Sequence, residues 1–304
     1  MQKHRFSTNF IVGAAMALVF TFTAQAQNTV SFVAYNGSDT NACTATAHCR
    51  SFTRALAVTD SGGEIIVVSS GSYAAATIAQ PVTINAVGVV ATTSETTAGL
   101  NALYINTTGN VTINGLNLIG GGTGNDGIYV NAVGILHLYN MQIQGFANNG
   151  IDFASAGGSL TLDGSTISDC GHDGLLVQGS GNRAFVHNTD FENNAFAGAD
   201  NVTGYVDITD SSAQLNQYGF YADGGRVRLY NDRAMFNTNG LAVTGTSSAN
   251  GAGNMYFAAC LLSDNTNSYN IGSGGVLSGS SPGTTMIPPG QGTVGTLSAA
   301  QTLQ

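Results

Sequence analysis

Two columns of polar and aromatic side chains carry the residue types that bind sugars and move protons from them. They lie in segments of the form Leu-x-Leu, where the intervening residues would face solvent if the aliphatic ones face a core. The first column reads His137, Thr161, Phe185, Asp207, Arg228 and Tyr256, and the second reads Tyr139, Asp163, His187, Thr209 and Tyr230. Imidazole, guanidinium, phenol and carboxylate groups in one ladder can hold a charged sugar and transfer its protons.

Five of these residues are the predicted catalytic groups if the protein is an enzyme. His187 or Tyr230 would remove a proton, and Arg228 would neutralise a substrate carboxylate. Asp163 and Asp207 would orient those two groups, because Asp163 would neighbour His187 and Asp207 would neighbour Arg228. The alternative is a solvated surface of varied polar residues that performs no chemistry.

A repeated phrase predicts the elements that position this ladder. A polar residue, a glycine, an aliphatic residue, any residue and an apolar residue recur at intervals of 21 to 24 residues. The glycines of the phrase are Gly127, Gly150, Gly174, Gly198, Gly219 and Gly240. Each repeat also holds one of the alternating strands described above. A period of this length predicts a single-stranded parallel β-helix, an all-β solenoid whose stacked rungs bury their inward columns.

Further columns follow from the same stacking. A third inward position is predicted for Ile143, Ile167, Phe191, Leu215, Phe236 and Leu262. Asparagines near the turns fit a left-handed backbone or hydrogen bonds along the stack, namely Asn148, Asn194, Asn216, Asn237 and Asn265.

A second set of outward residues is predicted in the strand that follows each repeat glycine, at Tyr129, Asp152, Leu176, Asp200 and Tyr221. Asp152 and Asp200 would lie two rungs apart, about 10 Å. That separation is compatible with the paired carboxylates of an inverting glycosidase. Any two acids two rungs apart would show it as well.

The first residues have the pattern of an export signal. Lys3 and Arg5 precede an uncharged stretch from Phe10 to Thr23, and Ala24-Gln25-Ala26 supplies the small residues before a cleavage site. We therefore expect residues 1–26 to be a signal peptide and the protein to be secreted, either to the periplasm or to the medium. A membrane anchor is the alternative, but a spanning helix needs about 20 apolar residues and this stretch is shorter.

Composition limits the partners. Without residues 1–26 the chain has no lysine and six arginines against 17 Asp and Glu. This acidic balance disfavours nucleic acid and anionic membranes, which need clustered cations. No cofactor is evident. Calcium could be held by Asp169 with Asp173 or by Asp207 with Asp210, although neither spacing forms a recognised loop.

The four cysteines divide into two kinds. Cys43 and Cys49 bracket a short loop in a chain expected to reach an oxidising compartment, which favours a disulfide over a free pair. Cys170 and Cys260 would lie about four rungs apart, near 19 Å, which is too far for a bridge. They are predicted to be buried fillers.

The predicted organisation is one domain with two ends. Residues 27–60 form an N-terminal cap with a short helix that uses Phe52 and Leu56, residues 61–271 form the β-helix, and residues 272–304 form a cap or tail rich in Gly, Ser, Thr and Pro. The order of helix, strand, Gly71-Ser72-Tyr73 turn and strand resembles the start of many secreted right-handed parallel β-helix proteins, the pectate-lyase-like group. This resemblance covers roughly residues 50–270.

The resemblance implies a protein that binds or processes extracellular polysaccharide, of which polymers that contain uronic acids are one class. The activity would be that of a lyase, hydrolase or epimerase. No intact catalytic motif of these enzymes is present, so the sequence leaves open whether the protein is an enzyme. The rival hypothesis is a non-catalytic envelope, matrix or adhesion protein that uses the solenoid as a scaffold.

Overall fold

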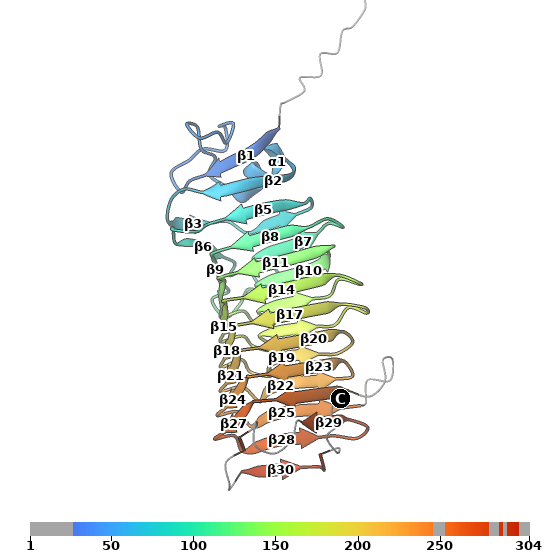
Figure 1. Ribbon diagram of the computed structural model, residues 1–304. Coiled ribbons are helices and arrows are strands. Elements are labelled where there is room, and N and C mark those ends of the chain that lie inside the picture. Colours follow the sequence, from blue (N-terminus) through green and yellow to red (C-terminus); the bar gives the residue numbers. More distant parts are fainter. Residues whose placement is uncertain (1–26, 246–252, 280–285, 288–290, 298–304) are drawn as a thin grey trace, which may run out of the picture.

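The computed structural model describes residues 27–245, 253–279, 286–287 and 291–297. Over these residues the chain winds into a right-handed parallel β-helix, in which three sheets run along the length of the molecule (Figure 1). The helix α1 (Phe52–Val58) is the only helix in this part of the chain. The predicted fold class is therefore confirmed. The predicted signal peptide lies outside the described residues.

Each full turn of the coil adds one strand to each sheet, and all sheet neighbours are parallel. Sheet 1 contains β1 (Asn28–Val33), β2 (Thr59–Val67), β5 (Val82–Asn85), β8 (Val111–Asn114), β11 (Ile135–Tyr139), β14 (Ser159–Asp163), β17 (Arg183–His187), β20 (Tyr205–Thr209), β23 (Arg226–Tyr230), β26 (Asn254–Ala258) and β29 (Val276–Gly279). Sheet 2 contains β3 (Gly71–Tyr73), β6 (Ala91–Ser94), β9 (Leu116–Ile119), β12 (Gln142–Gln144), β15 (Thr166–Ser168), β18 (Asp190–Glu192), β21 (Ser212–Gln214), β24 (Arg233–Met235) and β27 (Leu261–Ser263). Sheet 3 contains β4 (Ala76–Ile78), β7 (Leu103–Asn106), β10 (Ile128–Ala132), β13 (Ile151–Phe153), β16 (Leu175–Val177), β19 (Ala197–Asn201), β22 (Tyr218–Asp223), β25 (Asn239–Thr244), β28 (Asn267–Ile271) and β30 (Gly292–Val294).

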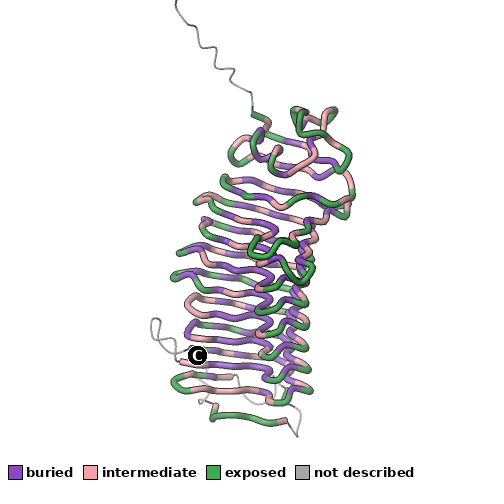
Figure 2. Tube along the Cα trace, turned by 180° about the vertical axis from the view of Figure 1, so that it is seen from behind, coloured by how far each residue is buried: buried purple, intermediate pink, exposed green. Residues whose placement is uncertain are grey.

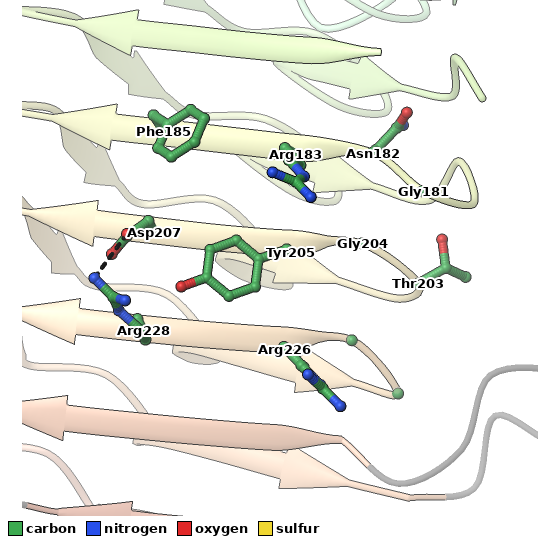
Figure 3. Close-up of a pocket in the computed structure, with 12 residues that line it drawn as sticks. Gly181, Asn182, Arg183, Phe185, Thr203, Gly204, Tyr205, Asp207, Arg226 and Arg228 are labelled. Carbon is green, nitrogen blue, oxygen red and sulfur yellow. Dashed lines mark ion pairs between the residues drawn. The ribbon is translucent and has the colours of Figure 1, made fainter. Parts of the chain in front are cut away.

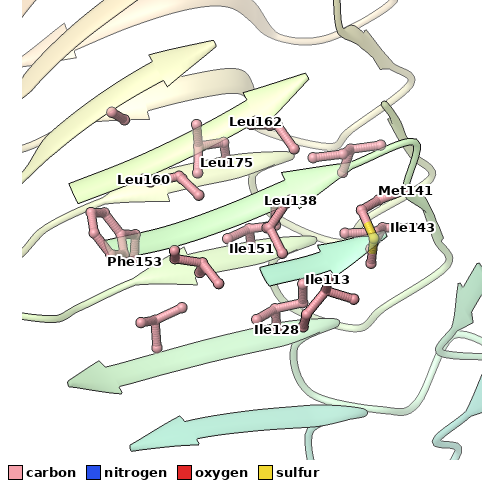
Figure 4. Packing of buried hydrophobic residues seen from close by; sticks show 14 of the residues in the cluster. Ile113, Ile128, Leu138, Met141, Ile143, Ile151, Phe153, Leu160, Leu162 and Leu175 are labelled. Carbon is pink, nitrogen blue, oxygen red and sulfur yellow. The ribbon is translucent and has the colours of Figure 1, made fainter. Parts of the chain in front are cut away.

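The core is a continuous apolar column inside the coil. Strands alternate inward and outward residues, so Leu160 and Leu162 of β14 are fully buried while Thr161 between them is half-buried. Figure 4 shows these leucines meeting Ile151 and Leu175 from sheet 3 across the interior. Burying one such side chain stabilises the fold by about 1.5–3 kcal/mol. The burial pattern repeats on successive rungs (Figure 2).

The third inward column differs from its prediction at two rungs. Ile143, Ile167, Phe191 and Leu262 are buried as predicted, but Leu215 and Phe236 are 52% and 54% exposed. The inward positions on those rungs belong to Ala213 and Ala234, which pair in register with Phe191 and Leu262. Leu215 and Phe236 lie beyond the ends of β21 and β24, where φ is 60° and 58° and the turning backbone directs their side chains outward.

The turn asparagines form a buried hydrogen-bonded ladder between sheets 2 and 3. The Oδ1 atom of Asn216 accepts hydrogen bonds from the backbone N–H and the Nδ2 of Asn194 at 2.8 and 3.2 Å. The Oδ1 atom of Asn237 accepts the same two hydrogen bonds from Asn216, and the Oδ1 atom of Asn265 accepts them from Asn237. Asn148 does not join them, because its Nδ2 donates to Asp126 instead. All five predicted turn asparagines therefore bond to a neighbouring rung, four of them within the asparagine ladder and Asn148 to Asp126.

The N-terminal end of the coil is covered by β1 and α1 (Figure 1). The side chain of Ser51 caps α1 by accepting a hydrogen bond from the backbone N–H of Arg54. Phe52 and Leu56 of α1 are buried. Cys43 and Cys49 form the predicted disulfide. Cys170 and Cys260 are free and buried.

At the other end, two strands lie within the segment predicted to be a cap or tail. Strand β29 extends sheet 1 beyond β26, and β30 extends sheet 3 beyond β28. Gln291 caps the asparagine ladder, because its Oε1 accepts from the backbone N–H of Asn265. No helix in the described part of the chain is long and apolar enough to cross a membrane.

Candidate functional site

The outer face of sheet 1 carries both predicted ladder columns in the predicted register. Phe185, Asp207 and Arg228 are neighbours on β17, β20 and β23. Asp163 and His187 are neighbours on β14 and β17. The strands position these side chains because residues two apart on a strand share a face. The structure therefore places all five predicted catalytic residues on one surface, while their catalytic role stays a prediction.

A groove with a volume of about 880 Å³ crosses three strands of this face. Figure 3 shows that β17, β20 and β23 each contribute side chains to it. The residues that line the groove are Gly181, Asn182, Arg183, Phe185, Thr203, Gly204, Tyr205, Asp207, Gly224, Gly225, Arg226 and Arg228. Of the predicted catalytic residues, Asp207 and Arg228 line it, whereas Asp163, His187 and Tyr230 lie outside it. The name arginine groove is used below for this site.

The sequence prediction missed three lining residues that share one column, Arg183, Tyr205 and Arg226. They pair in register at the start of β17, β20 and β23. Each precedes the first inward residue of its strand and therefore faces outward like the two columns that were predicted. The alternation of inward and outward residues, continued two residues further toward the N-terminal end of each strand, would have identified them.

The arginine groove is a local positive region on an acidic protein. It holds three of the six arginines outside residues 1–26, in a chain whose formal net charge is −9. The Nη2 atom of Arg228 lies 3.0 Å from Oδ2 of Asp207. Among the described residues, no acid lies within ion-pair distance of Arg183 or Arg226. Two guanidinium groups are thus available for an external anion, while Asp207 fixes the third.

His187 lies beside the groove between two carboxylates. Its Nδ1 is 2.9 Å from Oδ1 of Asp163, and its Nε2 is 3.4 Å from Oδ2 of Asp210. The hydrogen bond with Asp163 raises the pKa of His187 above its ordinary value, and the charges of both acids act in the same direction. A general base needs a free ring nitrogen, and both nitrogens here face acids. In this geometry Tyr230, which is 60% exposed, is the more accessible of the two predicted bases.

The outer face of sheet 3 is a second unusual surface, because its outward acids are buried. Asp152 and Asp200 are each 5% exposed, and Tyr221 is 9% exposed. Gln178 donates from Nε2 to both carboxylate oxygens of Asp152, at 2.7 and 2.9 Å. Asp200 has a buried Oδ1 with no hydrogen-bond partner among the described residues.

Aromatic rings gather on the same face of sheet 3. Tyr218 stacks on Tyr221 with ring centroids 4.9 Å apart, and Phe196 meets both rings edge-on. His172 stacks on Phe196 at 4.8 Å, and its Nδ1 lies 2.7 Å from Oδ2 of Asp173. His172 and Phe196 come from the turns before β16 and β19, and both tyrosines come from β22. The name aromatic cluster is used below for His172, Phe196, Tyr218 and Tyr221.

The acids suggested for calcium already have partners in the structure. Asp169 accepts a hydrogen bond from Asn193, and Asp173 pairs with His172. Asp207 pairs with Arg228, and Asp210 faces His187. Within the described ranges, no group of three or more His, Cys, Asp or Glu side chains is placed to hold a metal ion. Calcium binding stays a prediction.

Residues 101–262 match the family model described as "Right handed beta helix region". The chain belongs to this family. Among solved structures, pectate lyase Pel9A is similar with a TM-score of 0.57 and 17% identity, covering 85% of this chain and 78% of its own. XylC, solved in complex with xylose, is similar with a TM-score of 0.63 and 11% identity, covering 82% and 69%. These likenesses show the fold alone. No curated protein matches the chain.

Proposed function

We propose that the protein is a secreted β-helix protein that binds a uronic-acid polysaccharide in the arginine groove. The observation that carries the proposal is the column of Arg183 and Arg226, with Arg228 beside it, in a chain with an excess of acids. Cations concentrated against the overall charge of a protein need a local reason, since a dispersed arrangement would repel less. An anionic ligand is that reason.

The spacing of the groove suits a polymer. Arg183 and Arg226 lie two rungs apart, about 10 Å along the axis of the solenoid. A polyuronate carries one carboxylate on every sugar, so one chain along the axis can meet both arginines. Guanidinium groups bind carboxylates through paired hydrogen bonds. The ring of Tyr205 lies between Arg183 and Arg226, and the ring of Phe185 lies beside Arg183 on β17 (Figure 3). Both rings offer apolar surface to the sugar rings.

Processing of the bound polymer is the finer part of the proposal. Arg228 would neutralise the carboxylate of a bound sugar, and Tyr230, two residues further along β23 on the same face, would remove a proton from that sugar. Asp207 would hold Arg228 in place, and Asp163 would orient His187 beside the groove. The names of two fold neighbours, a pectate lyase and a protein solved with xylose, support sugar as the ligand class.

The test is binding of polygalacturonate compared with its fully methyl-esterified form. The two polymers share one backbone and differ in charge. The protein should bind polygalacturonate, and esterification should weaken binding at least tenfold. Arg228→Ala and the double variant Arg183→Ala/Arg226→Ala should each lower affinity for polygalacturonate about tenfold or more, because each loses charge-assisted hydrogen bonds.

The matched control is Arg233→Ala. Arg233 is exposed on β24 of sheet 2, outside the groove, and its loss changes the net charge by the same amount as that of Arg228. It should leave affinity unchanged. Equal binding of the two polymers, or equal losses for Arg228→Ala and Arg233→Ala, would exclude recognition in the groove. If the protein binds neither polymer, the hypothesis of a non-catalytic scaffold protein is favoured instead.

A further inference from the structure

A pocket with a volume of about 450 Å³ opens on the outer face of sheet 3 at its first rungs, next to the N-terminal cap. Thr77 of β4 and Tyr104 of β7 form its floor, since both face outward and pair in register. Thr53 of α1 and the turn 95–102 between β6 and β7 provide its walls. Small-molecule sites in proteins have volumes of about 300–1,000 Å³. The pocket is therefore large enough for a sugar unit.

The turn that walls the pocket is held by the equivalent turn of the next rung, between β9 and β10. The Oγ1 of Thr123 donates a hydrogen bond to the backbone oxygen of Thr96 at 2.6 Å. The backbone N–H of Asn125 donates to the backbone oxygen of Leu100 at 2.7 Å, and its Nδ2 donates to Oδ1 of Asn101 at 3.0 Å. Because this wall is already ordered, a ligand would bind without a large cost in conformational entropy.

Polar side chains that line the pocket still have free hydrogen-bonding groups. The Oε1 of Glu95 accepts a hydrogen bond from the backbone N–H of Thr97 at 2.8 Å, whereas its Oε2 has no partner among the described residues. The Oδ1 of Asn101 is taken by the next turn, but its Nδ2 has no partner in the described part of the chain. Thr53 and Thr77 are exposed and bring two hydroxyl groups. The pocket thus offers a charged acceptor, an amide donor and two hydroxyls to a ligand.

Tyr104 adds an apolar ring face to these polar groups. Its ring stacks on that of Tyr129 on the next rung, with centroids 5.7 Å apart and planes 12° from parallel. The opposite face of the Tyr104 ring therefore points toward β4, where the small side chain of Thr77 leaves it uncovered. The rings of the aromatic cluster, on later rungs of the same face, pack against one another instead. Leu100, which is 52% exposed, adds further apolar surface to the pocket.

We propose that this pocket binds an uncharged sugar unit of a polysaccharide. A sugar combines a face of C–H groups, which stacks on an aromatic ring, with hydroxyls that donate to carboxylates and accept from amides. Tyr104 supplies the ring, Glu95 the acceptor and Asn101 the donor. None of the described residues that line the pocket is basic, and the charge of Glu95 repels a uronate. The ligand thus differs from the anionic polymer proposed for the arginine groove, and the inference does not depend on that groove.

Binding is located with Leu100→Trp, which places a single tryptophan in the pocket of a chain that otherwise has none. Titration with galactan, arabinan, arabinoxylan and dextran should change the tryptophan fluorescence for at least one polymer. Val87→Trp, at a 64% exposed position after β5, is the control reporter, and its fluorescence should stay constant. Affinity for the neutral polymer should not depend on salt, whereas polygalacturonate binding in the arginine groove should weaken as salt rises.

Calorimetry of the protein without the reporter tests the lining residues. Tyr104→Ala should weaken binding of the neutral polymer about tenfold or more, and Tyr104→Phe should stay within about twofold because it keeps the ring. Glu95→Gln should weaken binding about threefold to tenfold, since it keeps the acceptor for Thr97 and loses the charge. Glu192→Gln, on β18 of sheet 2, makes the same change of charge elsewhere and should leave affinity unchanged.

Further arms of the experiment separate the two sites and a loss of fold. Tyr104→Ala should leave affinity for polygalacturonate unchanged, and Arg228→Ala should leave affinity for the neutral polymer unchanged. If the urea midpoint of Tyr104→Ala falls, Glu95→Gln decides in its place. The proposal is overturned if no neutral polymer binds, if Tyr104→Ala or Glu95→Gln binds as tightly as the wild type, or if the fluorescence of the Val87→Trp reporter changes as much as that of Leu100→Trp.

Discussion

At the residue scale, two bulky apolar side chains occupy backbone positions that favour small polar ones. Leu215 and Phe236 have φ of 60° and 58° and stand half-exposed on adjacent rungs. The equivalent turn position on other rungs is held by Asp169, Asn193 and Asp264, all with φ between 54° and 56°. A left-handed backbone costs an ordinary L-residue about 1–2 kcal/mol, and Asn or Asp less. Leu215 and Phe236 therefore store strain that neighbouring rungs avoid.

Leu215→Asn should raise the free energy of unfolding by about 1 kcal/mol, because it relieves this strain and removes little buried surface. The measurement is the urea midpoint of unfolding. Leu100→Asn is the matched control, since Leu100 is equally exposed at 52% and has no left-handed φ. It should change stability by less than about 0.5 kcal/mol. A lower midpoint for Leu215→Asn would mean that contact between the two apolar side chains outweighs the strain.

At the scale of elements, the turns between sheets 2 and 3 are held by hydrogen bonds from one rung to the next. Asn216 is buried, its Nδ2 donates to the backbone oxygen of Phe191, and its Oδ1 accepts from Asn194. Each amide thus satisfies backbone groups that the turn leaves unpaired. The ladder couples neighbouring rungs, which otherwise meet only through their strands and core columns.

Asn216→Ala should lower the free energy of unfolding by about 3 kcal/mol or more, because it leaves several buried polar groups without partners. Chemical unfolding followed by circular dichroism provides the measurement. Asn131→Ala is the control, since Asn131 makes a comparable rung-to-rung bond to Asn106 at an exposed position. Its effect should stay below about 0.5 kcal/mol. Similar losses of unfolding free energy for the two variants would show that burial does not determine how much these hydrogen bonds stabilise the fold.

At the scale of the whole molecule, the solenoid buries acids that a globular surface would leave in water. Burial raises the pKa values of Asp126 and Asp200, and it raises that of Asp152 to about 6 and that of Asp232 to about 7. The folded protein therefore binds more protons than the unfolded chain at pH values between about 4 and these raised pKa values. Stability must fall as pH rises through that window.

The protein should accordingly unfold at a higher temperature at about pH 5 than at about pH 8. The contribution of each acid is complete below its unfolded pKa near 4 and is lost as pH rises through its folded pKa. His187 and His172, whose pKa values are also raised by carboxylate partners, act in the same direction. Thermal unfolding across a pH series is the measurement. A temperature of unfolding that rises from pH 5 to pH 8 would contradict the assignment of these acids.

The sequence alone was sufficient for the fold and for the register of its outward columns. Both depend on local periodicities, namely the 21- to 24-residue repeat and the alternation within each strand. In a parallel stack, residues one repeat apart in sequence become neighbours on adjacent rungs. Asp163 beside His187 and Asp207 beside Arg228 followed from this arrangement. The cysteine loop of the cap was also predictable, because its two ends lie close in sequence.

Only the tertiary structure decided which outward residues are exposed and which are buried. Asp200 and Arg228 both alternate outward from their strands, yet one is 5% exposed and the other faces an open groove. The difference arises from turns and side chains on neighbouring rungs, and these are not encoded in the alternation of a single strand. Leu215 and Phe236 were misplaced for another reason: Phe191 pairs with Ala213, 22 residues later, and not with Leu215, 24 residues later, so both large side chains fall in the turn after their strand.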